Sequence, residues 1–481
     1  MRKDDYMAKR ILLDLSDQKP GVTGTRQLFD VHFPEETYGV DGYTNNIAFL
    51  VDCGTVQGED NEEEMNKTFD FDITKPEFGI LTHGHLDHYG EYPFAIKKGF
   101  QGPIFTTYVT KSFLSQVFLE DCLKIEKRRA KKDDSEPLYS ELEVGKMNSY
   151  MIPCAYHKRI QYNDNICIYF FDNGHVPGAA VTLVQLSCPG YEEINIVISG
   201  DYNDHNTFFK VNPLPQWVYE LPNVIIILEA TYGDTKVSDL RPACFIKNIT
   251  KALAQNKTCI VPAFSFVRTQ EVDYVLKEAQ DIGKLDPRIP IYNDGKTAIG
   301  CTKIFSSNEF KMYPHMRDFL PQNLSFVEDK EFRKFLKGDD TPKIIVSSSG
   351  MGTHGPSQSY INAYLRNPNS IIHATGHLSP DSKLGKLMQD KDGDGILTQL
   401  FDTDEFSAHG KQEVLVKFVE PFKKENVKCI MITHGDEPAK KELQYVLLDT
   451  YDIDVQILSS DSIFRITSDG IVTSFPKQKN S

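Results

Sequence analysis

The sequence predicts an α/β protein, because short apolar, β-branched runs alternate with helical patterns along the 481-residue chain. Several of these runs end one or two residues before an acidic or imidazole side chain. They are residues 47–51 before Asp52, 194–199 before Asp201, 224–228 before Glu229 and 429–433 before His434. Folds of this class place their chemistry at the carboxyl ends of buried strands. We therefore expect the functional site at these strand ends.

Further strands and helices follow in the second half of the chain. Residues 259–261, 343–346 and 371–372 are predicted strands, and residues 269–280 and 357–365 are predicted helices. Together they indicate a parallel sheet flanked by helices.

The candidate site residues lie both before about residue 235 and after about residue 402, so the stretch between them is predicted to be an insertion. We expect a discontinuous first domain of residues 1–236 and 403–481. Residues 237–402 would form the inserted domain.

A metal-ligand motif begins where the predicted strand of residues 78–82 ends. The run from Thr82 to His88 contains His83, His85, Asp87 and His88. Imidazole nitrogens and carboxylate oxygens are the donors that zinc and similar divalent ions accept. The alternative, a polar surface turn, rarely gathers so many donors in so short a stretch.

Composition narrows the class of protein. A hydrophobic fraction of 40% is enough for ordinary cores, and no apolar stretch approaches the ~20 residues that span a bilayer. The first residues lack the apolar segment of a secretory signal, so we expect a cytoplasmic protein with no membrane partner. The nine cysteines are scattered singly, which favours neither a disulfide framework nor a thiolate zinc site.

The net charge of -15 argues against a protein that binds nucleic acid over its whole surface. It does not exclude a nuclease, because bound dications reverse the local charge. A helix predicted from about residue 109 onward carries a basic group that either lines a substrate groove or is a solvated helix end. The group is Lys124, Lys127, Arg128, Arg129, Lys131 and Lys132.

The motifs, taken in order, resemble the metallo-β-lactamase superfamily. The first set is Asp52, the His83-to-His88 motif, His175 in Gly-His-Val-Pro-Gly and Asp201 in Ser-Gly-Asp. Later motifs resemble the β-CASP branch, which includes messenger-RNA cleavage endonucleases and RNase J type enzymes. They are Glu229 in Leu-Glu-Ala-Thr-Tyr-Gly, the run of residues 263–271, His409 in Phe-Ser-Ala-His and His434 in Thr-His-Gly-Asp. The resemblance implies an αβ/βα sandwich with an inserted β-CASP α/β domain.

The resemblance also implies two zinc ions per chain, with manganese as an alternative. One ion would be held by His83, His85 and His175, and the other by Asp87, His88 and His434. Asp201 would bridge the two ions. Asp52 would support a ligand histidine by a hydrogen bond without touching metal. A water between two such ions loses a proton near neutral pH.

The predicted catalytic residues are Asp87, Glu229 and His409. Glu229 and His409 resemble the family's carboxylate–imidazole pair, in which the imidazolium protonates the leaving group. His434 stands where DNA-processing relatives usually carry valine, which favours RNA.

Contacts to substrate are predicted at the glycine loop of residues 347–355 and at Arg268. Ser349 and Gly350 either form a backbone nest for phosphate or belong only to a turn. Arg268 is either a phosphate clamp or part of a structural ion pair.

The sequence thus predicts a dinuclear zinc phosphodiesterase that cleaves single-stranded RNA in an endo or 5′-3′ exo mode, with a homodimer as a possible assembly. Single-stranded RNA is favoured because only an unpaired strand threads a narrow groove. Three alternatives stay open: a hydrolase of a small-molecule ester or lactam, a DNA nuclease, and a noncatalytic scaffold.

Overall fold

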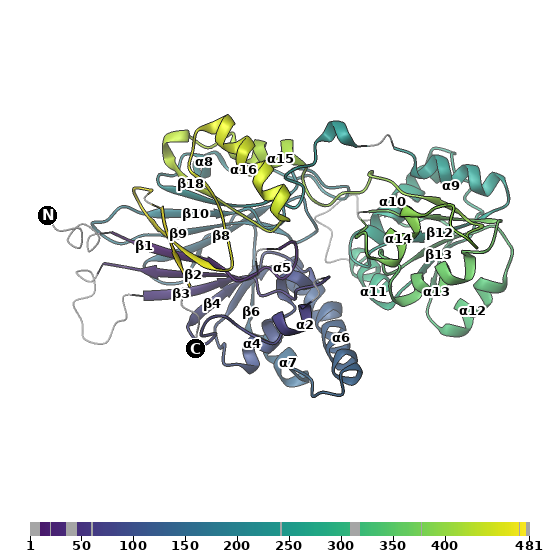
Figure 1. The fold of residues 1–481 in the computed structure, drawn as a ribbon, viewed down its shortest axis with the longest axis horizontal. Coiled ribbons are helices and arrows are strands. Elements are labelled where there is room, and N and C mark those ends of the chain that lie inside the picture. Colours follow the sequence, from purple (N-terminus) through teal and green to yellow (C-terminus); the bar gives the residue numbers. More distant parts are fainter. Residues whose placement is uncertain are drawn as a thin grey trace. The chain divides into compact units, whose positions relative to one another are not determined.

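The computed structural model describes residues 10–19, 21–34, 46–58, 61–240, 243–307, 318–376, 378–470 and 472–477. The chain divides into two compact units (Figure 1). Unit 1 comprises Met1–Asn206, Lys210–Val237 and Ala408–Ser481, and unit 2 comprises Thr207–Phe209 and Ser238–Ser407. Along the chain, unit 2 is therefore inserted into unit 1.

Unit 1 contains two sheets. The eight-stranded sheet has the order β21-β20-β1-β2-β3-β4-β5-β6. Its strands are β1 (Leu12–Asp17), β2 (Gln27–His32), β3 (Asn46–Val51), β4 (Pro76–Ile80), β5 (Ile104–Thr107), β6 (Met151–Cys154), β20 (Ser462–Thr467) and β21 (Val472–Pro476). The seven-stranded sheet has the order β19-β18-β11-β10-β9-β8-β7. Its strands are β7 (Ile160–Gln161), β8 (Ile166–Asp172), β9 (Ala180–Leu186), β10 (Ile194–Ile198), β11 (Val224–Glu229), β18 (Val427–Thr433) and β19 (Val455–Ile457).

The two sheets of unit 1 share one buried core. Phe49 of β3 stacks between Phe29 of β2 and Phe78 of β4, with ring centroids 4.8 and 5.0 Å apart. Ile168 of β8 and Ile196 of β10 belong to the same buried cluster. Burial of this apolar surface holds the sheets face to face, as in a sandwich.

Helices cover the outer faces of the sandwich (Figure 1). Leu415 and Leu443 pack against Ile226 and Ile430 on the outer face of the seven-stranded sheet. Tyr92 donates a hydrogen bond to the Ile80 carbonyl of the other sheet. The helices of unit 1 are α2 (Glu62–Met65), α3 (Leu86–Tyr89), α4 (Tyr92–Lys97), α5 (Tyr108–Phe113), α6 (Leu119–Lys132), α7 (Glu141–Tyr150), α8 (Gln216–Tyr219), α15 (Gln412–Val419) and α16 (Glu437–Tyr451), with a π-helical segment (Leu114–Phe118) between α5 and α6.

Unit 2 is built on a parallel six-stranded sheet of order β14-β13-β15-β12-β16-β17. The strands are β12 (Thr258–Pro262), β13 (Ile291–Asp294), β14 (Leu324–Val327), β15 (Ile344–Ser347), β16 (Ser370–His373) and β17 (Gln399–Phe401). The helices are α9 (Phe245–Ala254), α10 (Arg268–Asp281), α11 (Lys296–Phe305), α12 (Lys330–Gly338), α13 (Gly355–Tyr364) and α14 (Lys383–Gln389). Along β12, Cys259 and Val261 pack on one side with α9 and α10, and Ile260 packs on the other with α13. Apolar residues on both faces are what a parallel sheet covered by helices requires.

The predicted fold class, a sandwich with an inserted α/β domain, is confirmed. The strands predicted before Asp52, Asp201, Glu229 and His434 are β3, β10, β11 and β18. All nine cysteines are free thiols. Within the part of the chain that the structure describes, no helix is both long and apolar enough to cross a membrane.

Candidate metal centre

The candidate site lies at the carboxyl ends of strands from both sheets of unit 1. The parallel strands β10, β11 and β18 end at or just before Asp201, Glu229 and His434. In the other sheet, the parallel strands β3 and β4 lead to Asp52 and to the loop that carries His83. Because carboxyl ends of parallel strands meet at one edge of a sheet, residues distant in sequence arrive together.

The metal-ligand motif changes from loop to helix after His85. The one-turn helix α3 begins at Leu86 and contains Asp87 and His88. The neighbouring loop approaches this turn so closely that a Cβ on Gly54 would lie 1.5 Å from the Asp87 carbonyl oxygen. Glycine is therefore needed at position 54 to let the motif keep its shape.

The first donor cluster consists of His83, His85, His175 and Asp201. The Nδ1 atom of His85 lies 3.0 Å from Nε2 of His83 and 3.0 Å from Nε2 of His175. The Asp201 Oδ2 atom lies 3.5 and 3.4 Å from the same two Nε2 atoms. Donor atoms around a tetrahedral zinc lie about 3.3 Å apart, since each bond is about 2.0–2.1 Å long. The cluster has the spacing of a zinc site.

The second donor cluster consists of Asp87, His88 and His434. The Asp87 Oδ2 atom lies 3.8 Å from the Nε2 atoms of both His88 and His434. The other carboxylate oxygen of Asp201, Oδ1, lies 3.3 and 3.5 Å from these nitrogens. Asp201 thus presents one oxygen to each cluster.

The donor set fits two divalent cations. The Nε2 atoms of His88 and His434 and the Oδ1 atom of Asp201 are buried and have no hydrogen-bond partner among the described residues. Buried polar atoms without partners are costly, and a shared cation would satisfy all three at once. Imidazoles with carboxylates suit zinc, and they also accept manganese.

Hydrogen-bond partners on Nδ1 orient two of the imidazole rings. Asp52 Oδ2 lies 2.7 Å from Nδ1 of His88, and the Thr82 amide and hydroxyl each donate to Asp52 at 2.8 Å. A carboxylate on Nδ1 keeps the proton there and leaves Nε2 available to a metal. In the same way, the Ala408 carbonyl lies 3.0 Å from Nδ1 of His175.

Burial and neighbouring charges act differently on the two clusters. Burial lowers the pKa of His85 to about 4 and lowers the pKa of His83 and His175 well below the usual value. Burial also acts to lower the pKa of His88, but the carboxylates of Asp201, Asp52 and Asp87 together raise it well above its usual value. The same competition between burial and Asp201 raises the pKa of His434 to about 9.

A carboxylate–imidazole pair stands beside the two clusters. Nδ1 of His409 lies 3.0 Å from Oε1 of Glu229, and Nε2 lies 3.9 Å from Oδ2 of Asp201. The backbone amides of Tyr202 and Thr231 donate to the Glu229 carboxylate at 2.6 and 3.0 Å. Burial acts to lower the pKa of His409, but Glu229 raises it above the usual value. Glu229 thereby fixes the His409 ring with Nε2 toward Asp201, an arrangement that could serve a general acid.

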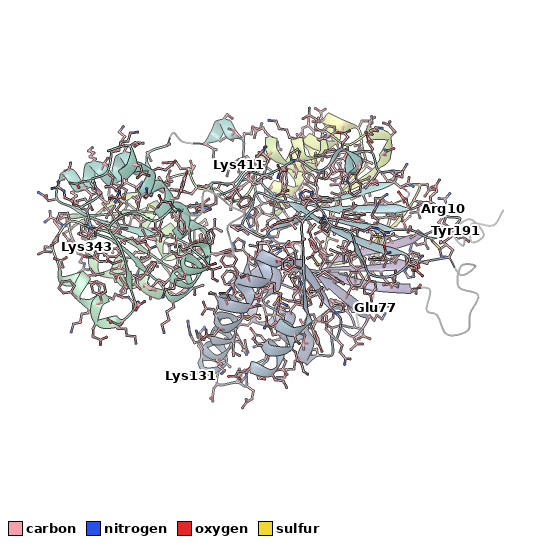
Figure 2. All side chains as sticks on the ribbon, turned by 180° about the vertical axis from the view of Figure 1, so that it is seen from behind. Arg10, Glu77, Lys131, Tyr191, Lys343 and Lys411 are labelled. Atoms are coloured by element: carbon pink, nitrogen blue, oxygen red, sulfur yellow. The ribbon has the colours of Figure 1, made fainter. Side chains whose placement is uncertain are left out.

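A lysine and a tyrosine lie next to each other beside His409 in unit 1. Lys411, labelled in Figure 2, places Nζ 3.4 Å from the centroid of the Tyr232 ring. The Tyr232 ring meets His409 edge-on, with centroids 5.9 Å apart. This edge-on contact packs the Tyr232 ring against His409.

The residues predicted to touch substrate lie in unit 2. Arg268 is buried, and its guanidinium donates to the carbonyls of Thr375 and Phe406 and pairs with Glu271 at 3.2 Å. These contacts match the alternative of a structural ion pair. Gly350 is buried against the Phe264 ring, and Ser349 is partly exposed in the same loop.

Sequence patterns did not point to three supporting groups. Thr82 could have been found from its place directly before the motif, and Thr231, whose hydroxyl lies 3.0 Å from Nδ1 of His434, from its place after Glu229. The Ala408 carbonyl leaves no trace in the sequence, because any residue type supplies it.

Family models match two stretches of the chain. Residues 269–385 match the Beta-Casp domain, and residues 395–458 match the Zn-dependent metallo-hydrolase RNA specificity domain. The first stretch falls within unit 2.

Several proteins are similar over most of the chain. The transcription termination factor FttA of Methanosarcina mazei is 26% identical over 88% of this chain and 68% of its own length. Ribonuclease TTHA0252 of Thermus thermophilus is 28% identical over 70% of this chain and 75% of its own. Probable RNase MJ4 of Methanocaldococcus jannaschii is 26% identical over 82% and 89%.

Proposed function

Because the chain belongs to the β-CASP branch of the metallo-β-lactamase superfamily, we propose that it is a dinuclear zinc-dependent phosphodiesterase that cleaves single-stranded RNA. The observation that carries the proposal is Asp201, whose two carboxylate oxygens face two separate donor clusters. The ribonucleases among the relatives, and the RNA specificity domain that residues 395–458 match, support RNA as the substrate.

In this proposal the donor clusters each hold one ion. The first ion would be held by Nε2 of His83, Nε2 of His175 and Nδ1 of His85. The second would be held by Asp87, His88 and His434. When bound, the two cations would acidify a water molecule and neutralise charge on the phosphate. Asp201 holds both positions in register. Manganese as the native ion, and a homodimer, stay predictions.

The Glu229–His409 pair supplies the proton that the leaving oxygen needs. Glu229 fixes the ring through Nδ1, and Nε2 of His409 carries the proton toward the clusters. In-line attack of water on the phosphodiester, with protonation of the leaving 3′ oxygen, gives a 5′-phosphate and a 3′-hydroxyl.

The test is cleavage of labelled single-stranded RNA by the purified protein with zinc or manganese, beside DNA of the same sequence and a generic ester. We expect cleavage of RNA that is lost with a chelator and in His83→Ala and Asp201→Ala. His205→Ala is the matched control, because that imidazole is 75% exposed. Hydrolysis that persists in both site variants, or that favours the ester, would refute the proposal.

A further inference from the structure

One outer surface of unit 1 gathers aromatic and basic side chains away from the donor clusters. Trp217, the single tryptophan of the sequence, lies on α8 and is 41% exposed. Its ring centroid is 5.2 Å from that of Tyr169 and 6.0 Å from that of Phe171, both on β8. A large exposed aromatic ring set on other rings is an uncommon surface feature.

The alternation of β8 produces this surface. Ile168 and Phe170 point into the core between the sheets, so Tyr169 and Phe171 point to the outer face. Phe171 is buried beneath Trp217, whereas Tyr169 is partly exposed. The rings of Tyr169 and Phe171 are parallel to within 4°. Two aromatic rings, Trp217 and Tyr169, therefore remain accessible side by side.

A basic segment of the chain, which includes Arg159, lies beside Tyr169. His157, Lys158 and Arg159 are exposed in the segment after β6. Burial raises the pKa of Tyr169, and the Arg159 guanidinium beside it partly offsets this effect. The nearby carboxylate, Asp172, pairs with His157 at 2.6 Å. The Asp172 carboxylate is thus held by His157, and the side chains of Lys158 and Arg159 are exposed.

The basic group on α6 differs from this surface. Lys124 pairs with Glu120 at 2.6 Å, Lys127 pairs with Glu141, and Arg129 pairs with Glu126 and Asp133. Three of the six basic residues of this group therefore have carboxylate partners on α6 or beside it, as in a solvated helix end. On the Trp217 surface, by contrast, a cation lies beside aromatic rings.

We propose that the Trp217 patch, defined as Lys158, Arg159, Tyr169 and Trp217, binds an unpaired segment of RNA outside the metal centre. Bases stack on Trp217 and Tyr169, and phosphates contact Lys158 and Arg159. The inference rests on the proposed function for its choice of RNA. The patch is also close to the first donor cluster along the chain, because β8 ends at Asp172, three residues before His175. RNA is favoured over a protein partner because the cations complement phosphate on a chain whose net charge is -15.

The single tryptophan makes the patch observable directly. Short unlabelled single-stranded RNA is titrated into His409→Ala protein loaded with zinc, in which RNA is expected to stay intact, and intrinsic fluorescence is recorded. We expect saturable quenching, because a base stacked on Trp217 quenches its emission. Binding that leaves the fluorescence unchanged would overturn the proposal.

Variants separate stacking from charge, with affinity measured by anisotropy of labelled RNA. Trp217→Ala should weaken binding about 5- to 150-fold, and Trp217→Phe should retain most of it because the ring and its packing remain. Removing both Lys158 and Arg159 should lower the salt dependence of the binding constant by about 1.4 in log–log slope. Tyr445→Ala, at an aromatic that is 66% exposed on α16, is the control and should change nothing. Equal affinity of Trp217→Ala and the unaltered protein would refute the patch.

Failure of the patch and failure of the proposed function give different results. Cleavage of RNA by the unaltered protein without quenching of Trp217 refutes the patch alone. Quenching without any cleavage refutes the proposed function and leaves the patch as an RNA-binding surface.

Discussion

The two donor clusters share Asp201 but are built differently. In the first, His83 and His175 are buried and His85 is half-buried, and burial keeps the pKa values of the three imidazoles low. In the second, burial acts to lower the pKa values of His88 and His434, but Asp201 and Asp87 raise them, and Asp52 adds to this effect on His88. The imidazoles of the first cluster are therefore neutral and ready for a cation, whereas those of the second hold protons that a cation must displace.

The two clusters, at the same edge of the fold, should therefore bind metal with different dependence on pH. Neutral imidazoles bind a metal without releasing protons, but a cluster rich in carboxylates binds it in competition with protons. We expect the first ion to be held over a wider range of pH, and the second to depend on solution conditions and on the residues that support His88.

The largest effect is expected for Asp201→Ala, because both clusters lose a donor. Metal content should fall below two ions per chain, and the rate of RNA cleavage should fall about 10³-fold or more, since the ions contribute several kcal/mol to the transition state. Mass spectrometry under native conditions counts the ions. Asp204→Ala is the control at a neighbouring carboxylate whose side chain is 48% exposed. Unchanged stoichiometry in Asp201→Ala would show that this carboxylate bridges nothing.

His409→Ala tests whether the acid is separate from both clusters. The rate should fall about 10²- to 10⁴-fold, the range for loss of a general acid, while two ions remain bound. Glu229→Gln should lower the rate in the same direction, because the Glu229 carboxylate no longer orients and charges the ring. A loss of metal in His409→Ala would instead place this imidazole among the ligands.

Lowering the pH should release the second ion before the first. The pKa of His434 is raised to about 9, so this imidazole binds a proton increasingly as the pH falls from 9, and the proton competes with the cation. The pKa of His85 is lowered to about 4, so the first cluster stays unprotonated down to that region. Between pH 8 and pH 6 the affinity of the second site should fall by up to about 100-fold, or about tenfold per pH unit for each proton displaced. Calorimetric titration with zinc at both pH values measures this, and equal loss at both sites would contradict the comparison.

The smallest effect is expected for Asp52→Asn, which alters support of His88 but removes no ligand. The affinity of the second ion should fall about 10- to 100-fold, as for other outer partners of metal-bound histidines. The first ion should be retained. Asp30→Asn, at a carboxylate whose side chain is 33% exposed on β2, provides the control in the same sheet. Loss of both ions in Asp52→Asn would mean that Asp52 stabilises the whole edge of the sheet.

The strands and donors were predictable because their signals are local. Apolar runs that end at Asp201, Glu229 and His434 identify both a buried strand and its functional end. The sequence alone could not assign Oδ1 and Oδ2 of Asp201 to different clusters, because that depends on side-chain orientation between two sheets.

Hydrogen bonds from the backbone to the site could not be predicted from the sequence either. The Ala408 carbonyl that holds His175 is 233 residues away along the chain, and no residue type encodes such a contact. The exposure of Trp217 was also not predictable, since it depends on how the short helix α8 covers β8. Both features arise from tertiary packing, which local propensity does not specify.

The most direct test of the central claim is anomalous X-ray diffraction at the zinc edge on crystals of the zinc-loaded protein. We expect two peaks per chain, one among His83, His85 and His175 and one among Asp87, His88 and His434, with the Asp201 carboxylate between them. A single peak, or two peaks that do not share Asp201, would contradict this expectation.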